Sequence, residues 1–227
     1  MPRRARSLPG LIAKLTAHHG ELRPPSRDPW HLILLENVVY LVDDAVRQRA
    51  FARLKQLTDL DADTIARCPD ELLAEACGHG RMAANQIAKL RRCAELFLSD
   101  GDPRELIGLP PAKAGKALRR YPGIGAPGAE RMLLFAGRDT VLALDSNALR
   151  VLLRLGYGTE AKSYATSYRS AQTAAMSELP AAVEPLIEAH LVLQQHGRTI
   201  CRNSNPSCAE CPLRRTCPSR DQPPAMA

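Results

Sequence analysis

Apolar residues recur three and four positions apart along most of this 227-residue chain. That spacing places them on one face of an α-helix, and the long alternating runs of β-branched residues that predict strands are missing. The predicted helices cover Pro29–Val42, Ala45–Leu57, Asp61–Arg67, Glu71–Ala76, Met82–Ser99, Pro103–Gly108, Pro111–Arg120, Ala126–Ala136, Ser146–Leu155, Ala161–Glu178 and Ala181–His196. The pattern therefore predicts an all-α protein.

Two segments fall outside this helical pattern. Pro24 and Pro25 mark an early break, and residues 221–227 are expected to form a disordered tail. No apolar run approaches the roughly 18 residues that predict a membrane-spanning helix. A chain of this length can form one large domain or two smaller ones with ample core.

The net charge of +7 favours a polyanionic partner, although charge alone does not separate nucleic acid from anionic lipid. Arginines gather near the C-terminus at Arg198, Arg202, Arg214, Arg215 and Arg220. Such a cluster suits contacts with DNA phosphates, and it is equally typical of a solvated surface. The arginine-rich N-terminus is not a secretory signal peptide, so we expect a protein of the reducing cytoplasm.

The spacing of four cysteines is the most specific sign of a metal site in this sequence. Cys201, Cys208, Cys211 and Cys217 are spaced C-x6-C-x2-C-x5-C, close enough for their thiolates to converge on one metal centre. Either an iron–sulfur cluster or a structural zinc would satisfy four thiolates. Zinc sites usually pair their ligands as two close couples, and only Cys208 and Cys211 form such a couple here.

A glycine-rich turn joins two of the predicted helices. In the segment Tyr121-Pro-Gly-Ile-Gly, Gly123 and Gly125 surround Ile124 just before a helix begins. Glycine permits a positive φ and a close approach of another backbone, while the first N–H groups of the next helix are free to donate. Together these features predict a phosphate-binding corner, although a simple interhelical turn would look similar.

An aspartate stands between an apolar stretch and a predicted helix. Asp145 follows Val141-Leu-Ala-Leu and precedes Ser146 and Asn147. Asp145 or Ser146 could simply cap the helix, a use that stabilises it by about 1 kcal/mol. A fixed carboxylate could also stabilise positive charge in a transition state. Both uses are compatible.

These three segments together resemble the endonuclease III and adenine glycosylase family of DNA repair enzymes. The cysteine spacing after His196-Gly-Arg resembles the family's 4Fe–4S loop. The PGIG turn resembles its helix-hairpin-helix motif L-P-G-x-G, with Tyr121 in place of leucine, and L-D-S-N-x-x-R-V resembles the adenine glycosylase segment. The resemblance implies that Asp145 is the catalytic carboxylate and that Asn147 supports it.

The resemblance also implies a fold, a cofactor and a partner. It implies the HhH-GPD fold, with a six-helix barrel domain at 24–136 whose hairpin lies near 113–136. A discontinuous iron–sulfur cluster domain would join residues 1–23 to 137–220, with the four cysteines on a 4Fe–4S cluster. The partner would be double-stranded DNA with a damaged or mispaired base, bound by the hairpin glycines and by Arg202. We expect a nucleoid-associated monomer.

One departure from the family concerns strand cleavage. Pro127 stands where endonuclease III enzymes carry the lysine that forms a Schiff base with the sugar. Proline cannot make that attack, so lyase activity should be weak or absent. The chain is predicted to be a monofunctional glycosylase.

Other departures leave the excised base open. Glu36 interrupts an apolar run at 31–42 and aligns with the glutamate that protonates the departing purine in adenine glycosylases. Burial would raise its pKa towards an acid-competent form, although Glu36 could also bond a neighbouring backbone or Arg. Tyr40 replaces one of two glutamines that fill the gap in DNA, and it could stack on a base or belong to the core.

The sequence therefore predicts a base-excision glycosylase for an adenine-type substrate, or for uracil or thymine mispaired with guanine. Three alternatives remain. The chain could be a non-catalytic DNA-structure binding protein of the same fold, or a bifunctional glycosylase and lyase that uses another amine. It could also be a zinc-stabilised nucleic-acid adaptor.

Overall fold

The secondary structure of this protein is helical throughout the residues that the computed structural model describes, which are 7–40, 42–78 and 81–220. Their helices are α1 Leu8–His19, α2 Pro29–Asn37, α3 Asp44–Thr58, α4 Ala62–Arg67, α5 Asp70–Cys77, α6 Arg81–Asp100, α7 Pro103–Leu106, α8 Pro111–Leu118, α9 Ala126–Phe135, α10 Ser146–Arg154, α11 Tyr164–Met176 and α12 Val183–Thr199. The predicted all-α class is confirmed. The tail at 221–227, expected to be disordered, lies outside the described residues.

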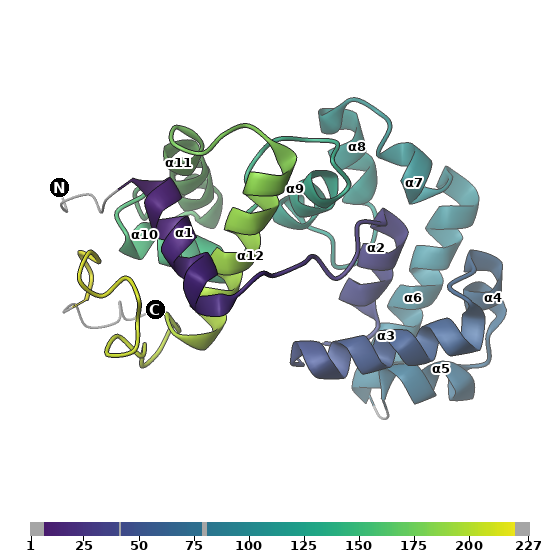
Figure 1. The fold of residues 1–227 in the computed structure, drawn as a ribbon. Helices are drawn as coiled ribbons and strands as arrows, with labels where there is room; N and C mark the ends of the chain where they lie inside the picture. Colours follow the sequence, from purple (N-terminus) through teal and green to yellow (C-terminus); the bar gives the residue numbers. More distant parts are fainter. Residues whose placement is uncertain (1–6, 41, 79–80, 221–227) are drawn as a thin grey trace. The chain divides into compact units, whose positions relative to one another are not determined.

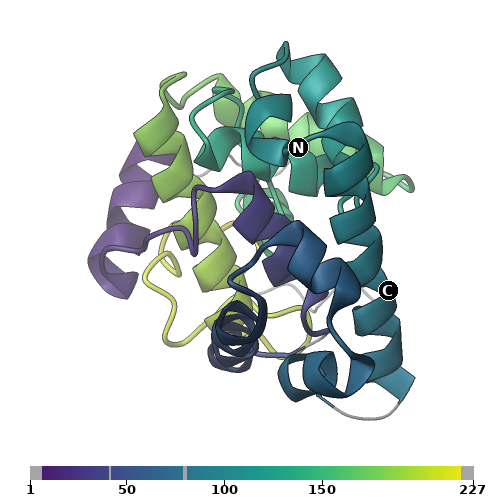
Figure 2. The same cartoon turned by 90° about the vertical axis from the view of Figure 1, so that its right-hand side faces the viewer.

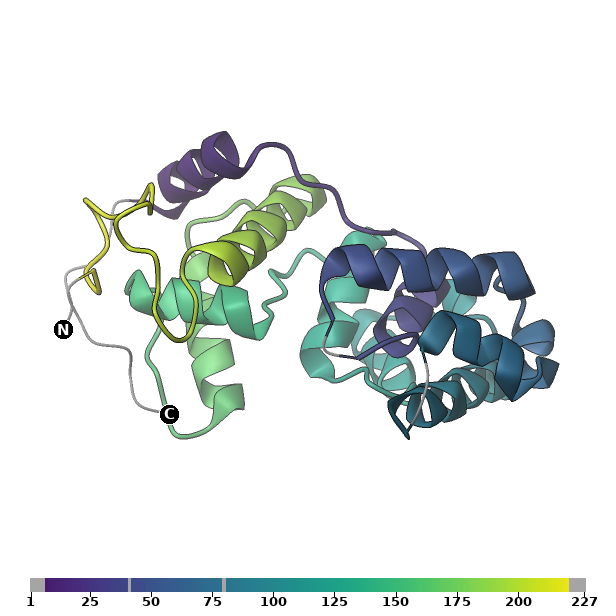
Figure 3. The ribbon, with the colours of Figure 1, turned by 90° about the horizontal axis from the view of Figure 1, so that it is seen from below.

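The chain divides into two units. One consists of residues Pro25–Arg138 and contains α2 to α9, and the other joins the residues up to Pro24 to those from Asp139 onward. The second unit is discontinuous in sequence because α1 packs along α12 (Figures 1 and 3). Across the described residues, no helix combines the length and apolar character needed to cross a membrane.

Helix α1 is fastened to its unit by both apolar and polar contacts. Leu8, Leu11 and Leu15 are buried on one face, as the helical spacing requires. The backbone N–H of Leu8 donates to the carboxylate of Glu178 at 2.6 Å. The Thr16 hydroxyl donates to Glu188 of α12, also at 2.6 Å. These contacts bring the two ends of the sequence into one unit.

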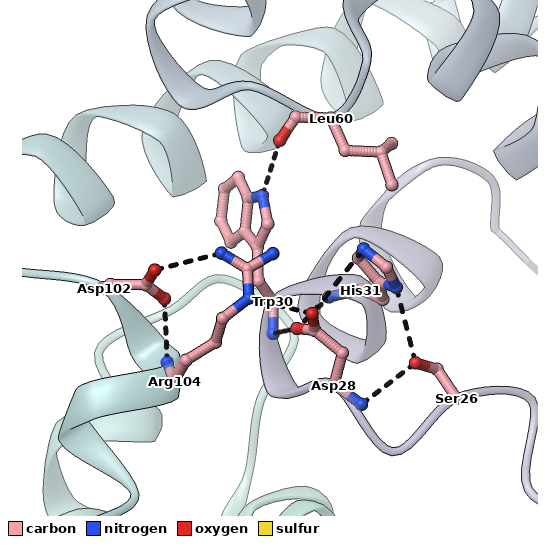
Figure 4. A network of polar contacts seen from close by, with 7 residues as sticks. All are labelled: Ser26, Asp28, Trp30, His31, Leu60, Asp102 and Arg104. Carbon is pink, nitrogen blue, oxygen red and sulfur yellow. Dashed lines mark hydrogen bonds and ion pairs between the residues drawn. The ribbon is translucent and has the colours of Figure 1, made fainter.

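The unit formed by α2 to α9 is built around α2. In this unit α6 runs beside α4 and α5 (Figures 1 and 2). The buried Trp30 of α2 donates its indole N–H to the Leu60 carbonyl at 2.8 Å. Asp28 caps the start of α2 by accepting the N–H groups of Trp30 and His31, and it also accepts from Arg104 (Figure 4). The capping carboxylate and the buried indole together fix where α2 begins.

Helix α2 ends at Asn37, so the expectation that it continues to Val42 is wrong. The side-chain amide of Asn37 donates to the carbonyls of Ile33 and Pro122, both at 2.9 Å. The Asn37 carbonyl itself accepts from the side chain of Gln86 at 2.9 Å. In a longer helix the Asn37 carbonyl would accept a backbone N–H four residues on, and here it accepts the Gln86 side chain instead.

Candidate active site and cysteine loop

Asp145 lies at the N-terminus of α10, directly after the buried residues 142–144. One carboxylate oxygen accepts the Ala148 N–H at 2.7 Å, which caps the helix. The other oxygen accepts the side-chain amides of Asn147 and Gln194, each at 3.0 Å. The capping role considered for Asp145 is therefore present, and the carboxylate is fixed in place by three donors. Its catalytic role stays a prediction.

The charge of Asp145 is preserved despite its burial. Burial alone raises the pKa of this carboxyl group, but hydrogen bonds from Ala148, Asn147 and Gln194 and the attraction of His190 lower it by more. The resulting pKa lies below the ordinary value of 3.8. At neutral pH Asp145 is thus a buried anion whose hydrogen-bond donors carry no formal charge of their own.

A chain of hydrogen bonds leads from Asp145 to the cysteine loop, defined as residues 201–217. The side-chain amide oxygen of Asn147 accepts from Arg150 at 2.9 Å. Arg150 also donates to the Gly197 carbonyl at 2.6 Å and to the Cys201 carbonyl at 2.9 Å. A Cβ on Gly197 would lie 2.6 Å from the backbone carbonyl oxygen of Asn147, so this glycine allows α10 and α12 to approach closely. Arg150 therefore ties the first cysteine to the helix that begins at Asp145.

Two tyrosines of α11 lie beside the Asp145 segment. The hydroxyl of the buried Tyr168 accepts the Leu144 N–H at 3.1 Å, one residue before Asp145. The ring of Tyr164 lies 6.1 Å from that of Tyr168 and is half-exposed. Burial and the negative charge of Asp145 raise the pKa of Tyr164. This pair was not predicted from the sequence, where its signal is a Tyr-x3-Tyr spacing on one helix face.

The cysteine loop follows α12 and is held by α10. All four cysteines are free thiols and partly exposed. Arg154 donates to the Cys201 sulfur at 3.3 Å and to the Arg202 carbonyl at 2.8 Å. The Arg154 carbonyl in turn accepts the thiol of Cys217 at 3.7 Å and the hydroxyl of Ser219, just after the loop, at 2.9 Å. The end of α10 thus holds both ends of the loop.

The four thiols interact with one another electrostatically. Burial, followed by the other three cysteine side chains, raises the pKa of Cys211 to about 11. Within the described part of the chain, no three His, Cys, Asp or Glu side chains are grouped to hold a single metal ion. Thiolates on a 4Fe–4S cluster each bind a different iron, so they surround a body larger than one ion. The donor set fits such a cluster, which itself stays a prediction.

His196 and Arg202 take part in holding the loop. His196 is buried, with one ring nitrogen 3.5 Å from the Cys211 sulfur and the other 3.2 Å from His19. Burial lowers the pKa of His196 to about 4, so it is a neutral hydrogen-bonding residue. Arg202 is exposed and reaches the Ser207 hydroxyl at 3.2 Å. Its predicted contact with DNA is untested.

The glycine-rich turn lies between α8 and α9 in the other unit. Gly123 has φ +74°, the left-handed region that its sequence pattern predicts. Its Cβ position would be 3.3 Å from the Asn37 side-chain oxygen, which has no hydrogen-bond partner within the described residues. Gly125 caps α9, and the Ile124 side chain is buried. The turn thus packs against the end of α2. Its contact with DNA stays a prediction.

Glu36 lies beside this turn, on the last part of α2. Its carboxylate forms an ion pair with Arg131 of α9 at 2.5 Å. The Glu36 side chain is 33 % exposed and that of Arg131 is 18 % exposed. The Nε–H of Arg131 has no partner among the described residues. The sequence allowed two interpretations of Glu36, a proton donor to the departing purine or a residue bonded to a neighbouring backbone or arginine. The bond to an arginine is present, and the proton-donor role stays a prediction.

Tyr40 and Pro127 also lie in this unit. Tyr40 is 53 % exposed, so it does not belong to the core, and Lys89 lies 5.6 Å from its ring centre. Pro127 occupies the first turn of α9, where a helix tolerates proline because the N–H is not needed. Neither side chain shows which base the protein handles.

Comparisons with known proteins define the fold. No family model matches the chain. The adenine DNA glycosylase of Mycolicibacterium smegmatis is 30 % identical over 154 residues, which cover 66 % of this chain and 47 % of that protein. The chain thus spans about half the length of this curated relative.

Two solved structures superimpose over nearly the whole chain. An endonuclease III trapped as a covalent intermediate with DNA matches with a TM-score of 0.72 at 20 % identity, over 95 % of this chain and 96 % of the other. A thermostable thymine-DNA glycosylase matches with a TM-score of 0.69 at 17 % identity, over 92 % and 94 %. The chain has the helix-hairpin-helix fold of these DNA glycosylases. The likeness to an adenine DNA glycosylase is in keeping with the family that the three sequence motifs resemble.

Proposed function

We propose that this protein is a DNA N-glycosylase of base-excision repair, with Asp145 as its catalytic carboxylate. The observation that carries the proposal is a buried anion held by three hydrogen bonds at the start of α10. Its sequence likeness to an adenine DNA glycosylase and its fold support the same activity. A rigid buried carboxylate is suited to a reaction that builds positive charge on its substrate.

The proposed reaction breaks the bond between the sugar carbon C1′ and the base nitrogen. The bonding electron pair leaves with the base, and positive charge develops on the deoxyribose. Asp145 stabilises this cation, and a water molecule then forms the new bond to C1′. The water's proton is released and ends on the departed base. Because the pKa of Asp145 is lowered, its main contribution is its charge rather than its basicity.

Hydrolysis without strand cleavage is the expected outcome. The sequence of α9 contains no lysine, and Pro127 stands where a Schiff-base amine would be needed. Lys113 and Lys116 lie on α8 instead. Trapping with borohydride tests this part of the proposal, since only an enzyme that forms a Schiff base becomes covalently linked to DNA. A trapped adduct would favour the bifunctional alternative.

The DNA is proposed to contact both units through their own elements. In the turn between α8 and α9, backbone groups of Gly123, Ile124 and Gly125 would bind phosphate, since the Ile124 side chain is buried. In the cysteine loop, the exposed Arg202 would make a phosphate contact. The exposed ring of Tyr40 would stack on a base.

The thiolates of Cys201, Cys208, Cys211 and Cys217 would hold a 4Fe–4S cluster, which cross-links the ends of the cysteine loop. The chain's own residues prepare this loop, because Arg150 and Arg154 hold its backbone on α10. Analysis for iron, acid-labile sulfide and zinc tests the assignment. Zinc without iron or sulfide would favour the zinc-stabilised adaptor.

The direct test of the activity uses purified, iron-loaded protein on a panel of DNA duplexes. The panel contains uracil or thymine opposite guanine, adenine opposite oxidised guanine, an oxidised pyrimidine, an alkylated purine and an abasic site. Each reaction is read with and without alkali, because alkali cleaves the abasic strand that a monofunctional glycosylase leaves. Breaks that need alkali support the proposal. Tight binding with no breaks on any duplex favours the non-catalytic DNA-structure binder.

A further inference from the structure

Two side-chain amides donate to the same oxygen of Asp145, but their other ends differ. The amide of Asn147 donates to Asp145 Oδ2 at 3.0 Å, and its own oxygen accepts from Arg150 at 2.9 Å. The amide of Gln194 also donates to Oδ2 at 3.0 Å, and its own oxygen has no hydrogen-bond partner in the part of the chain that the structure describes. Asp145, Asn147 and Gln194 belong to one unit, and each keeps some exposed surface.

The charge of Asp145 determines which end of the Gln194 amide faces it. An ionised carboxylate only accepts hydrogen bonds, so the NH₂ group faces Asp145 and the amide oxygen, Oε1, is turned away from it. Gln194 Oε1 is not among the buried side-chain atoms that lack a partner within the described residues, so it is open to solvent. Gln194 therefore presents an accessible acceptor beside the carboxylate.

Asp145 has a further acceptor site of its own. The two oxygens of a carboxylate offer about four lone pairs, and the three donors to Asp145 use three of them. The remaining lone pair is on Oδ1, which accepts only the Ala148 N–H within the described residues. Two acceptors, one on Asp145 and one on Gln194, thus lie on side chains that are joined by a hydrogen bond.

We propose that Gln194 is a catalytic residue, and that its side-chain oxygen and Asp145 together bind the water molecule that attacks C1′. This inference rests on the proposed glycosylase function and assigns the residue that holds its second reactant. The water donates one proton to Gln194 and the other to Asp145, which leaves a lone pair of its oxygen free to face the sugar.

The bonds and protons of this step balance without a further reactant. The bond from C1′ to the base nitrogen breaks, and its electron pair leaves with the base. The water oxygen then forms the new bond to C1′. The proton that the water loses is released and ends on the departed base. Gln194 keeps its own protons throughout, so its contribution is to position the water.

The number of protons on the attacking molecule supplies the sharpest experiment. Water can donate to both acceptors, whereas methanol has one O–H proton and can donate to only one of them. When excision is run in water containing methanol, capture of the sugar by water leaves an abasic site that alkali cleaves. Capture by methanol leaves a methyl glycoside that alkali does not cleave. Mass spectrometry of the strand gives the ratio of the two products, and single-turnover kinetics give the rate.

Four variants are compared on the duplex of the panel that the wild type excises fastest. Gln194→Met removes both the donor and the acceptor, and Gln194→Lys keeps a donor to Asp145 but has no acceptor. Asn147→Ala removes a donor to the same carboxylate oxygen, although its own amide oxygen is occupied by Arg150. Gln195→Met is the matched control, because Gln195 is the next residue of α12 and makes no hydrogen bond to Asp145 in the described structure.

The product ratio should separate the two glutamine variants from the others. Gln194→Met and Gln194→Lys should both raise the share of methyl glycoside by about two- to tenfold, the effect of one neutral hydrogen bond. Asn147→Ala should slow excision by about 10- to 100-fold and keep the wild-type product ratio. Gln195→Met should keep the wild-type rate and ratio. Thermal unfolding and affinity for an abasic-site duplex show that the variants fold and bind.

A wild-type product ratio in both Gln194 variants would overturn the inference even if excision were slower, because Gln194 would then act only by holding Asp145. A raised share of methyl glycoside in Gln194→Met alone would overturn it too, since the lost donor would be the cause. Both results leave the glycosylase function intact. If Gln194→Met does not fold, the comparison is made with Gln194→Lys. A wild-type protein that releases no base from any duplex would instead overturn the proposed function itself.

Discussion

Two carboxylates of this protein lie in contrasting surroundings. Asp145 is bound by a backbone N–H and two side-chain amides, none of which carries a formal charge. Glu36 is one partner of an ion pair with Arg131. Both residues align with carboxylates that the family resemblance marks as catalytic, yet their environments differ in kind.

The comparison shows that the groups bound to a carboxylate determine what its negative charge can do. An anion held by neutral donors keeps its negative charge available for a cation that develops on the substrate. An anion paired with a guanidinium is largely neutralised, and the pair offers spare N–H donors instead. In the proposed reaction the stabilisation of the sugar therefore falls to Asp145 and not to Glu36.

The largest expected effect comes from Asp145→Asn. Asparagine is as good a helix cap as aspartate, so folding and DNA binding should be nearly unchanged. The negative charge is lost, and excision should fall by about 1,000-fold or more. Single-turnover kinetics and a binding titration measure the two effects separately.

Asp61→Asn is the matched control, because Asp61 also caps a helix, α4, by accepting the Thr64 N–H. This control should excise at the wild-type rate. Excision by Asp145→Asn at the rate of the control would remove Asp145 from the mechanism and leave it as a helix cap.

The next largest effect is expected from removing one donor to Asp145. Asn147→Ala deletes a hydrogen bond of 3.0 Å to the charged oxygen and the acceptor for Arg150. Hydrogen bonds to charged groups contribute about 1.5–3 kcal/mol, so excision should slow by about 10- to 100-fold. Gln194→Ala deletes the other donor to the same oxygen. Wild-type rates in both variants would contradict the assigned role of these donors.

A smaller effect concerns the turn beside Glu36. Gly123→Ala forces a Cβ into the left-handed region and within 3.3 Å of the Asn37 side-chain oxygen. Gly137→Ala meets the same backbone strain at φ +68° but has no atom within 4 Å. We expect both variants to lose about 1–2 kcal/mol of stability from strain. Only Gly123→Ala should also weaken DNA binding, as measured by titration; equal affinities would separate the turn from DNA.

The smallest effect is expected in the pH dependence. Folding lowers the pKa of Asp145, so this residue stays charged as the pH falls below neutral. Its contribution to stability is fully present above pH 3.8, the ordinary pKa, and is lost as the pH falls through the lower pKa of the folded protein. The excision rate should therefore be nearly constant from about pH 7 down to about pH 5. A rate that rises on acidification would indicate a protonated catalytic group and would return Glu36 to the role of an acid.

The sequence predicts the parts of this protein that local patterns encode. Helical spacing predicts the all-α class, and short motifs identify Asp145, the glycine-rich turn and the four cysteines. Each of these signals is contained within about twenty residues, so it can be read without knowing which segments meet.

Residues whose partners are far away in the sequence could not be identified from such local patterns. Helix α2 ends at Asn37, whose side chain bonds Pro122, 85 residues away, and whose carbonyl accepts from Gln86, 49 residues away. Gln194 reaches Asp145 across 49 residues, and Arg131 reaches Glu36 across 95. In the sequence these side chains look like ordinary polar residues of helices. Their roles appear only when the partner segments are brought together by the fold.

The most direct test of the contrast measures excision by wild type, Asp145→Asn and Glu36→Gln side by side on the best duplex of the panel. Binding to the same duplex is measured in parallel. Glutamine can still accept a hydrogen bond from Arg131, so we predict that Glu36→Gln keeps excision within about tenfold of wild type. Asp145→Asn should bind as the wild type does and lose excision. A strong loss in Glu36→Gln with excision retained in Asp145→Asn would contradict the assignment of the two carboxylates.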